Sequence, residues 1–249
     1  MKVSDYIARF IAARGVAQVY EMSGGMITHL LDSIYLQGRP KIVSMHHEQA
    51  AAFAADATAR LTGVPGVAMA TSGPGATNLL TGVASCYFDS SPAVFITGQV
   101  HRLERRGDRP IRQLGFQETD IVAIAAPITK GAWQVETAGE LPLVLERAFR
   151  TALEGRPGPV IVDIPMDIQY EEMPADVPSP QRVTAGVPVV PASVEEALEL
   201  LGAAERPLIL AGGGIRAARA REARSGTAPA PGRAAGTSAS AARRASHRC

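Results

Sequence analysis

The hydrophobic positions of the first 165 residues alternate between two patterns. Short, nearly continuous apolar runs occur at residues 16–22, 41–45, 66–70, 92–100 and 159–165. Between these runs apolar residues recur at helical spacing, and glycine-rich turns follow several of them. Buried apolar strands that alternate with helices are typical of parallel sheets covered on both faces. The pattern therefore predicts an α/β fold, a doubly wound parallel sheet with helices on both faces.

The helical segments have recognisable starts and stops. Ser4 is suited to cap a first helix that runs to about Arg14, and a second helix follows the glycine turn at residues 23–25. The next predicted helix spans Glu48 to Leu61 and ends before a glycine and a proline. A helix from about Ala138 to Leu153 precedes the last strand of this domain.

The pattern changes after the last of these strands. Residues 1–170 form the first predicted domain, and residues 171–192, rich in proline, valine and acidic side chains, read as a linker. Residues 193–215 begin a second α/β unit with one helix and one strand, which we interpret as the truncated start of a central domain. Residues 216–249 lack large apolar side chains and are predicted to be disordered, and we hypothesise a frameshift in the coding DNA.

Charge and composition exclude several functions. The net charge of +1 combines a balance of +7 in residues 216–249 with a balance of −6 in the rest, so nucleic-acid binding by the body is not expected. No apolar run is long enough for a membrane span. The two cysteines, Cys86 and Cys249, do not suggest a disulfide framework, and a reducing, cytoplasmic location fits.

Each local motif also has an ordinary structural explanation. Glu48 opens a helix, where an acidic residue is favoured by the helix dipole. The glycine turns suit ligand approach but do not match the dinucleotide fingerprint. His46 and His47 would point to opposite sides of a strand end, so no metal site is predicted. Five arginines follow the fourth apolar run and suit either a solvated loop or a phosphate-bearing ligand: Arg102, Arg105, Arg106, Arg109 and Arg112.

The order of the motifs is more specific than any one of them. "HHEQAAAFAADATARLTG" is followed by "GVAMATSGPGATNLLTGVASCYFDSSPAVFITGQV", then by "GFQETDIV", "PITK" and "GRPGPVIVDIP". This series resembles the acetolactate synthase branch of the thiamine-diphosphate enzymes, closely over residues 1–170 and loosely over 190–215. The resemblance implies that residues 1–170 are the domain that binds the pyrimidine end of thiamine diphosphate.

The resemblance assigns a role to Glu48. It matches the family glutamate that contacts N1′ of the aminopyrimidine and promotes the imino tautomer, which is acid–base catalysis relayed through the cofactor. Gly24 and Gly25 match the cofactor-binding glycine turn, and Gln99 matches a strand end that faces the site.

Further positions follow from the same matching. Gln117 and Lys130 match catalytic positions, and Phe116 and Ser23 match positions near the substrate. Arg156 matches a contact to FAD in those family members that keep the flavin. Mg²⁺ is expected from the family's C-terminal domain, because its "GDG…N" motif does not occur in this sequence.

The implied activity is decarboxylation of a 2-keto acid and transfer of the acyl unit to an acceptor. Ser23 stands where the synthases usually have proline, and the loop after the fourth strand is longer and richer in arginine, which suggests a different acceptor. We expect little activity from the chain alone, and a partner that is a second copy, a full-length relative or a separately encoded C-terminal half. Alternatives are a non-catalytic dimerising or regulatory module and one half of a split thiamine enzyme.

Overall fold

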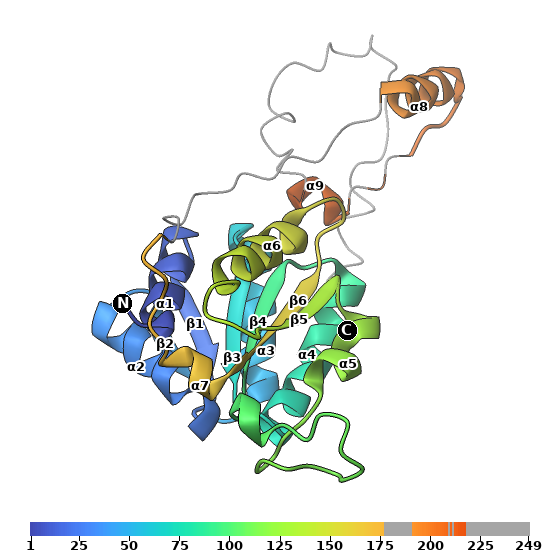
Figure 1. Cartoon of the computed structure of the whole chain (residues 1–249). Helices are drawn as coiled ribbons and strands as arrows, with labels where there is room; N and C mark the ends of the chain where they lie inside the picture. The colour runs from blue at the N-terminus through green and yellow to red at the C-terminus, as the bar shows by residue number, and fades with distance from the viewer. Residues whose placement is uncertain (177–190, 209, 211, 218–249) are drawn as a thin grey trace. The chain divides into compact units, whose positions relative to one another are not determined.

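The computed structural model describes residues 1–176, 191–208, 210 and 212–217. Its centre is a six-stranded parallel sheet with the strand order β2-β1-β3-β4-β6-β5 (Figure 1). The strands are β1 (Gln18–Glu21), β2 (Lys41–Ser44), β3 (Gly66–Ala70), β4 (Ala93–Gln99), β5 (Gly131–Gln134) and β6 (Pro159–Pro165). The predicted fold class is confirmed.

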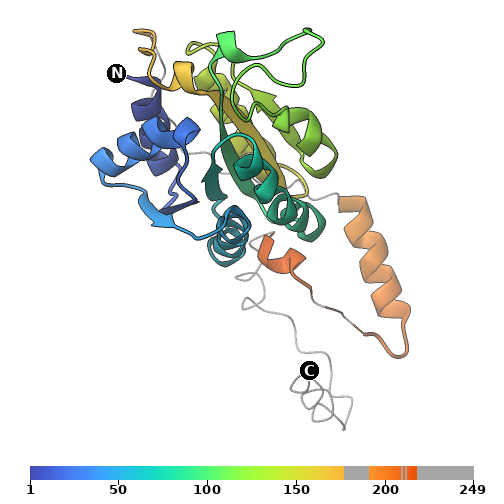
Figure 2. The ribbon, with the colours of Figure 1, turned by 90° about the horizontal axis from the view of Figure 1, so that it is seen from below.

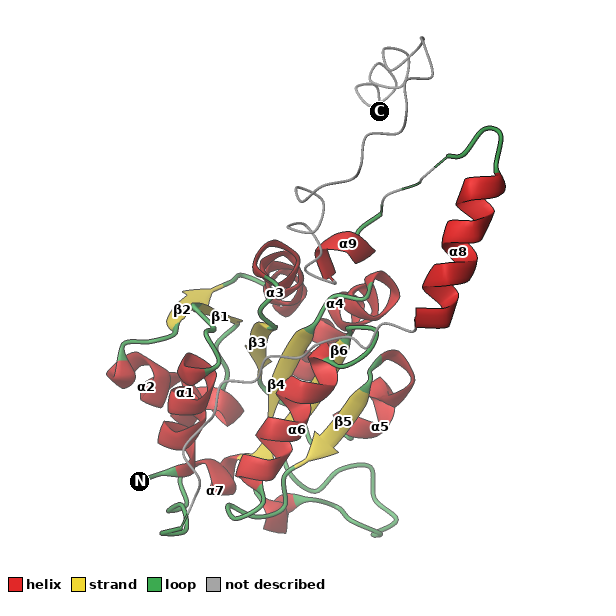
Figure 3. Cartoon of the chain, turned by 90° about the horizontal axis from the view of Figure 1, so that it is seen from above, coloured by secondary structure: helices red, strands yellow, loops and turns green. Residues whose placement is uncertain are grey.

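Helices cover both faces of this sheet (Figure 3). One layer contains α1 (Val3–Ala13), α2 (Thr28–Gln37), α6 (Leu141–Leu153) and α7 (Met166–Gln169). The other contains α3 (Glu48–Thr62), α4 (Pro74–Asp89) and α5 (Ile121–Ala125). Short 3₁₀ turns are η1 (Gly25–Ile27), η2 (Arg102–Glu104) and η3 (Ala126–Ile128).

The alternation of strand side chains divides the core into two layers. Val67 and Met69 of β3 face α1 and α2, whereas Ala68 and Ala70 face α3 and α4. Because β3 and β4 are buried on both faces, their sequences are apolar throughout.

Helices α3 and α4 lie side by side, as Figure 2 shows, and small residues let them approach closely. A Cβ added to Gly82 would come within 2.3 Å of the Cβ of Ala52. The buried alanines Ala51, Ala52, Ala55 and Ala59 therefore pack inside this chain. Close packing of α3 against α4 within the chain is therefore a structural reason for the alanine-rich sequence of α3.

The first helix starts earlier than predicted. Ser4 is not its cap but a buried residue of the first turn, whose hydroxyl accepts a hydrogen bond from Ser33 at 2.8 Å. Asp5 instead bonds the backbone N–H of Lys2 at 3.3 Å. Tertiary packing of a small hydroxyl against α2 has outweighed its local capping preference.

The packed part of the domain extends slightly past residue 170. Glu172 forms an isolated antiparallel β-bridge with Lys2, and the next side chain, Met173, is buried. Most of the predicted linker, residues 177–190, lies outside the described residues, as does the tail from residue 218. The chain divides into two units, residues 1–210 and 211–249. The first includes α8 (Pro191–Ala203), and α9 (Gly214–Ala217) is described in the second.

The strand expected near residues 206–214 does not appear among the described residues of that stretch, where Leu208 and Leu210 are exposed. A parallel strand needs hydrogen-bonding neighbours, and this part of the described chain supplies none.

Candidate functional site

The strand order creates a crevice at the carboxyl edge of the sheet. Strand β1 lies between β2 and β3, so the connections that leave β1 and β3 run to opposite faces. Such a switch point is where open α/β sheets bind ligands. The turn at residues 22–25, the start of α3 and the turn at residues 71–73 all follow strands at this edge.

Glu48 is the charged side chain of this crevice. It lies at the first position of α3 and is only 8% exposed. Asn78 of α4 donates a hydrogen bond from Nδ2 to its Oε2 at 2.9 Å. Within the described part of the chain Oε1 accepts no hydrogen bond, so this oxygen retains its capacity to bind a donor.

His47, immediately before Glu48, has a structural role. Its Nδ1 accepts a hydrogen bond from the backbone N–H of Gln49 at 3.0 Å, which caps α3. No cluster of three or more potential metal-binding His, Cys, Asp or Glu side chains occurs in the residues that the structure describes.

Thr71, at the end of β3, packs against glycines on both sides. A Cβ at Gly75 would lie 2.8 Å from Thr71 Cγ2 and 3.3 Å from Glu48 Oε1, and one at Gly24 would lie 2.4 Å from Thr71 Cβ. Thr71 Oγ1 also accepts a hydrogen bond from the N–H of Met26 at 3.2 Å. Gly75 therefore leaves Glu48 Oε1 without a neighbouring side chain on that side, and the absence of a side chain at Gly24 lets the two turns pack together.

The neighbouring Ser72 is an orphaned polar group. Its side chain is buried, and Oγ has no hydrogen-bond partner among the described residues. Buried hydroxyls are ordinarily hydrogen-bonded, so an unpaired one in a turn beside Glu48 fits a site that is completed by another molecule. The free Glu48 oxygen, the glycine cradle and Ser72 together fit an aminopyrimidine, which offers both donors and acceptors.

Gln117 is held next to this turn, and Phe116 is beside it. Gln117 has a φ of 61°, and Gly73, with a φ of 67°, has room for no side chain because a Cβ would come within 2.6 Å of Gln117 Cβ. Phe116 is 74% exposed. The structure thus brings Gln117 to the turn of Gly73, and it leaves the Phe116 ring available to a ligand.

Gln99 ends β4 with its side chain buried inside the fold. Its Nε2 donates to the carbonyl of Thr119 at 2.7 Å and to Asp163 Oδ2 at 3.1 Å. Gln99 therefore supports the segment that follows Gln117, and its own amide is engaged by protein groups.

Asp163 is a functional candidate that sequence reasoning missed. It lies on β6 and accepts hydrogen bonds from Thr97 at 2.5 Å, from Gln134 at 2.8 Å and from Gln99. Burial raises the pKa of its carboxyl to about 6, although these hydrogen bonds act in the opposite direction. The available signal was a lone acidic residue inside the apolar run "PVIVDIP".

The arginine-rich loop after β4 is braced at its start. Arg102 pairs with Asp167 at 2.7 Å and with Glu171, and Arg105 pairs with Glu136 at 2.5 Å. The hydrogen bond from Arg105 lowers the pKa of Glu136. Two of the five arginines thus hold the loop against the body.

Lys130 and Arg156 lie away from Glu48. Both precede strands, so they occupy the amino edge of the sheet, opposite the crevice. Lys130 Nζ donates to the carbonyls of Thr151 and Glu154 at the end of α6, and burial lowers its pKa. Arg156 Nε donates to Ser90 Oγ at 2.6 Å. The structure does not bring either residue to the Glu48 site of the same chain.

Cys86 is buried, as expected for a structural thiol, and burial raises its pKa. No described helix is both long enough and apolar enough to cross a membrane.

The comparisons with known proteins identify the domain that carries this crevice. The model of the N-terminal TPP binding domain of thiamine pyrophosphate enzymes matches residues 1–124. The chain therefore belongs to the thiamine pyrophosphate enzymes, of which it carries the N-terminal TPP binding domain.

Its relatives place it in the acetolactate synthase-like branch. A probable acetolactate synthase large subunit of Methanocaldococcus jannaschii is 40% identical over 227 residues, which cover 86% of this chain and 36% of the relative. The large subunit of acetolactate synthase isozyme 2 of Escherichia coli is 40% identical over 220 residues, which cover 88% of this chain and 39% of the relative. The acetolactate synthase large subunit of Parasynechococcus marenigrum is 42% identical over 216 residues, which cover 84% of this chain and 34% of the relative. The chain spans just over a third of the length of these relatives.

Proposed function

We propose that the crevice at Glu48 binds the aminopyrimidine end of thiamine diphosphate. The observation that carries the proposal is the Glu48 carboxylate, held through Oε2 by Asn78 while Oε1 lies free beside Gly75. When bound, thiamine diphosphate would supply the nucleophilic carbon needed for reaction with a 2-keto acid.

The chain's own residues then hold and move a proton. The free oxygen Oε1 of Glu48 would accept a hydrogen bond from a ring nitrogen and share its proton. Asn78 keeps the carboxylate oriented through its hydrogen bond to Oε2. We propose that Gly24 and Gly25 form the glycine turn next to the ring, and that the absence of a side chain at Gly75 keeps Glu48 Oε1 accessible to it. We propose that Phe116 and Gln117 face the substrate, with Ser23 nearby in the turn at residues 22–25; the exposure of Phe116 and the contact of Gln117 with the turn of Gly73 support this. Lys130 and Arg156 are outside this proposed site.

For the whole protein we propose the family's reaction, decarboxylation of a 2-keto acid and transfer of the acyl unit to an acceptor. Mg²⁺ would be bound by protein outside the described residues, and a cytoplasmic location would keep Cys86 reduced. We propose FAD binding only from the family resemblance, which points to Arg156. In this structure Arg156 Nε donates a hydrogen bond to Ser90 Oγ.

Replacing Glu48 with glutamine tests the proposal. The variant keeps the size of the side chain but removes the charged acceptor, so affinity for thiamine diphosphate with Mg²⁺ should fall about tenfold, equivalent to about 1.4 kcal/mol. Isothermal titration calorimetry on the full chain measures this, with Glu104→Gln in the exposed η2 turn as the matched control. Equal affinities of wild type and Glu48→Gln, with folding confirmed by circular dichroism, would exclude this role of Glu48.

A dimerising module is the second candidate, and exposed aromatic residues favour it. Phe53 of α3 is 42% exposed, and Tyr87 and Phe88 of α4 are 41% and 69% exposed. We propose that a second copy of the chain covers this α3–α4 surface, since exposed apolar patches mark interaction sites.

Sedimentation equilibrium tests this association. Wild type should sediment as a dimer at micromolar concentration, and Phe88→Asp should shift it to monomer, because an unpaired carboxylate is costly in an apolar interface. Leu143→Asp, at a similarly exposed leucine of α6 on the other layer, should leave the dimer intact. A wild type that remains monomeric at these concentrations contradicts the proposal.

A further inference from the structure

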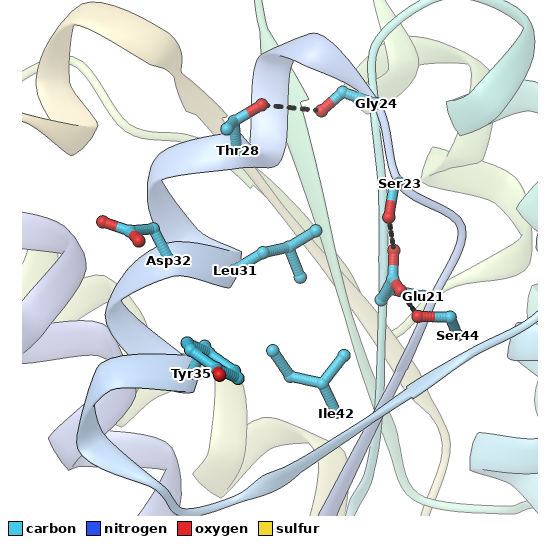
Figure 4. A pocket seen from close by; sticks show the side chains of 9 residues that line it. All are labelled: Glu21, Ser23, Gly24, Thr28, Leu31, Asp32, Tyr35, Ile42 and Ser44. Atoms are coloured by element: carbon cyan, nitrogen blue, oxygen red, sulfur yellow. Dashed lines mark hydrogen bonds between the residues drawn. The ribbon is translucent and has the colours of Figure 1, made fainter.

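A second concave site lies on the face of the sheet that α2 covers. It is an open pocket of about 610 Å³ between α2 and the ends of β1 and β2 (Figure 4). Nine residues line it: Glu21, Ser23, Gly24, Thr28, Leu31, Asp32, Tyr35, Ile42 and Ser44. Glu48 belongs to α3 in the opposite layer and does not line this pocket, which shares only Ser23 and Gly24 with the proposed pyrimidine site.

Glu21 places a negative charge in one wall of this pocket. It ends β1 and is 1% exposed, and Ser23 Oγ donates to its Oε2 at 2.9 Å while Ser44 Oγ donates to its Oε1. No ion pair joins Glu21 to a lysine, arginine or histidine within the described ranges. Burying a carboxylate without a cation is costly even when it is hydrogen-bonded, so a cationic partner would be favoured here.

The hydroxyl groups of Ser23 and Ser44 lie between the Glu21 carboxylate and the pocket and are polarised by it. Each hydroxyl group donates its hydrogen bond to Glu21, so the lone pairs of its oxygen remain available to accept hydrogen bonds. Both serines are exposed, whereas Glu21 beneath them is not. A ligand in the pocket therefore meets two hydroxyl oxygens polarised by a carboxylate, which suits a group that only donates hydrogen bonds.

The opposite wall adds a second charge and apolar surface. Asp32 and Tyr35 project from α2 and are exposed, and Leu31 and Ile42 form the apolar walls between them and Glu21 (Figure 4). None of the nine lining residues is basic. The aromatic face of Tyr35 can also attract a cation.

We propose that this pocket binds a small organic ammonium ion, with its –NH₃⁺ between the serine hydroxyls and Asp32 and its carbon skeleton against Leu31, Ile42 and Tyr35. A metal ion is disfavoured, because the described residues bring no three acidic or histidine ligands together. The proposal does not depend on the function assigned to Glu48.

Binding of 2-phenylethylammonium, compared with the neutral 2-phenylethanol, tests the proposal on the full chain. NMR titration should give at least tenfold tighter binding of the ammonium ion, with shifts confined to α2, the turn at residues 22–25 and the ends of β1 and β2. Asp32→Asn should weaken ammonium binding about fivefold and leave the alcohol unaffected. Asp108→Asn, an exposed loop carboxylate elsewhere, is the matched control and should change neither.

Glu21→Gln provides a second variant, which keeps both acceptor oxygens of the serines but removes the buried charge. It should lower ammonium affinity about tenfold; if it does not fold, the exposed Asp32→Asn variant decides alone. Equal affinities for the ammonium ion and the alcohol, no saturable binding up to 50 mM, or an unchanged affinity in Asp32→Asn would overturn the proposal.

Discussion

Replacing Gly98 with alanine is expected to destabilise the domain by about 3 kcal/mol or more, at the upper end of overpacking substitutions. Gly98 lies in β4, where a Cβ would approach the carbonyl oxygen of Met26 to 1.9 Å and its carbonyl carbon to 2.4 Å. Backbone atoms cannot move aside as a flexible side chain can. The turn η1 would have to shift away from the sheet.

That shift would also break a buried hydrogen bond. Gln169 Nε2 donates to the Met26 carbonyl at 2.8 Å, and Gln169 Oε1 already lacks a partner among the described residues. Urea unfolding followed by circular dichroism measures the loss. Gly139→Ala is the matched control, because its Cβ would meet only Pro174 Cγ at 3.9 Å, and it should remain within about 0.5 kcal/mol of wild type. If the two variants are equally stable, the close contact of η1 with β4 is wrong.

Much of this architecture could be predicted from hydrophobic pattern alone. The runs that became β3, β4 and β6 are apolar because both faces of those strands are buried, and Glu48 did open the helix that follows β2. Helices α5 and α7, of five and four residues, are too short to produce a helical period, and they were not predicted.

The site was predictable only in part, because side-chain partners come from distant segments. Glu48 accepts a hydrogen bond from Asn78, thirty positions later in the sequence. Asp163 of β6 accepts one from Thr97 of the neighbouring strand β4. Lys130 could have been placed better: it precedes Gly131 of β5, and residues before parallel strands lie at the edge opposite those that follow them. The family resemblance instead assigned Lys130 to a catalytic position, without regard to the edge of the sheet on which it lies.

The pH dependence of stability should show the buried charge of Asp163. Because burial raises its folded pKa to about 6 from an ordinary value of 3.8, the folded state binds a proton more tightly than the unfolded chain does. Its contribution is therefore fully present below pH 3.8 and is lost as the pH rises through about 6. A gap of about two pKa units corresponds to about 3 kcal/mol, so the free energy of unfolding should fall by about that amount over this range.

Asp163→Asn separates this residue from other titrating groups. The asparagine carbonyl can accept from Gln99 and Gln134, and its amide can donate to the hydroxyl oxygen of Thr97 in place of the bond that Thr97 donates in the wild type, so all three contacts can form without a charge. Urea unfolding at half-unit steps from pH 4 to pH 8 should show the downward slope in wild type and a flatter curve in the variant. Parallel curves for the two proteins would mean that Asp163 does not titrate in this range. Ionisation of Asp163 also strengthens its hydrogen bond from Gln99 Nε2, which fixes the amide that donates to the carbonyl of Thr119. The same charge that lowers global stability above pH 6 therefore orders the segment that contacts the turn of Gly73, and hydrogen exchange at residues 115–120 should slow over the same pH range once corrected for intrinsic rates.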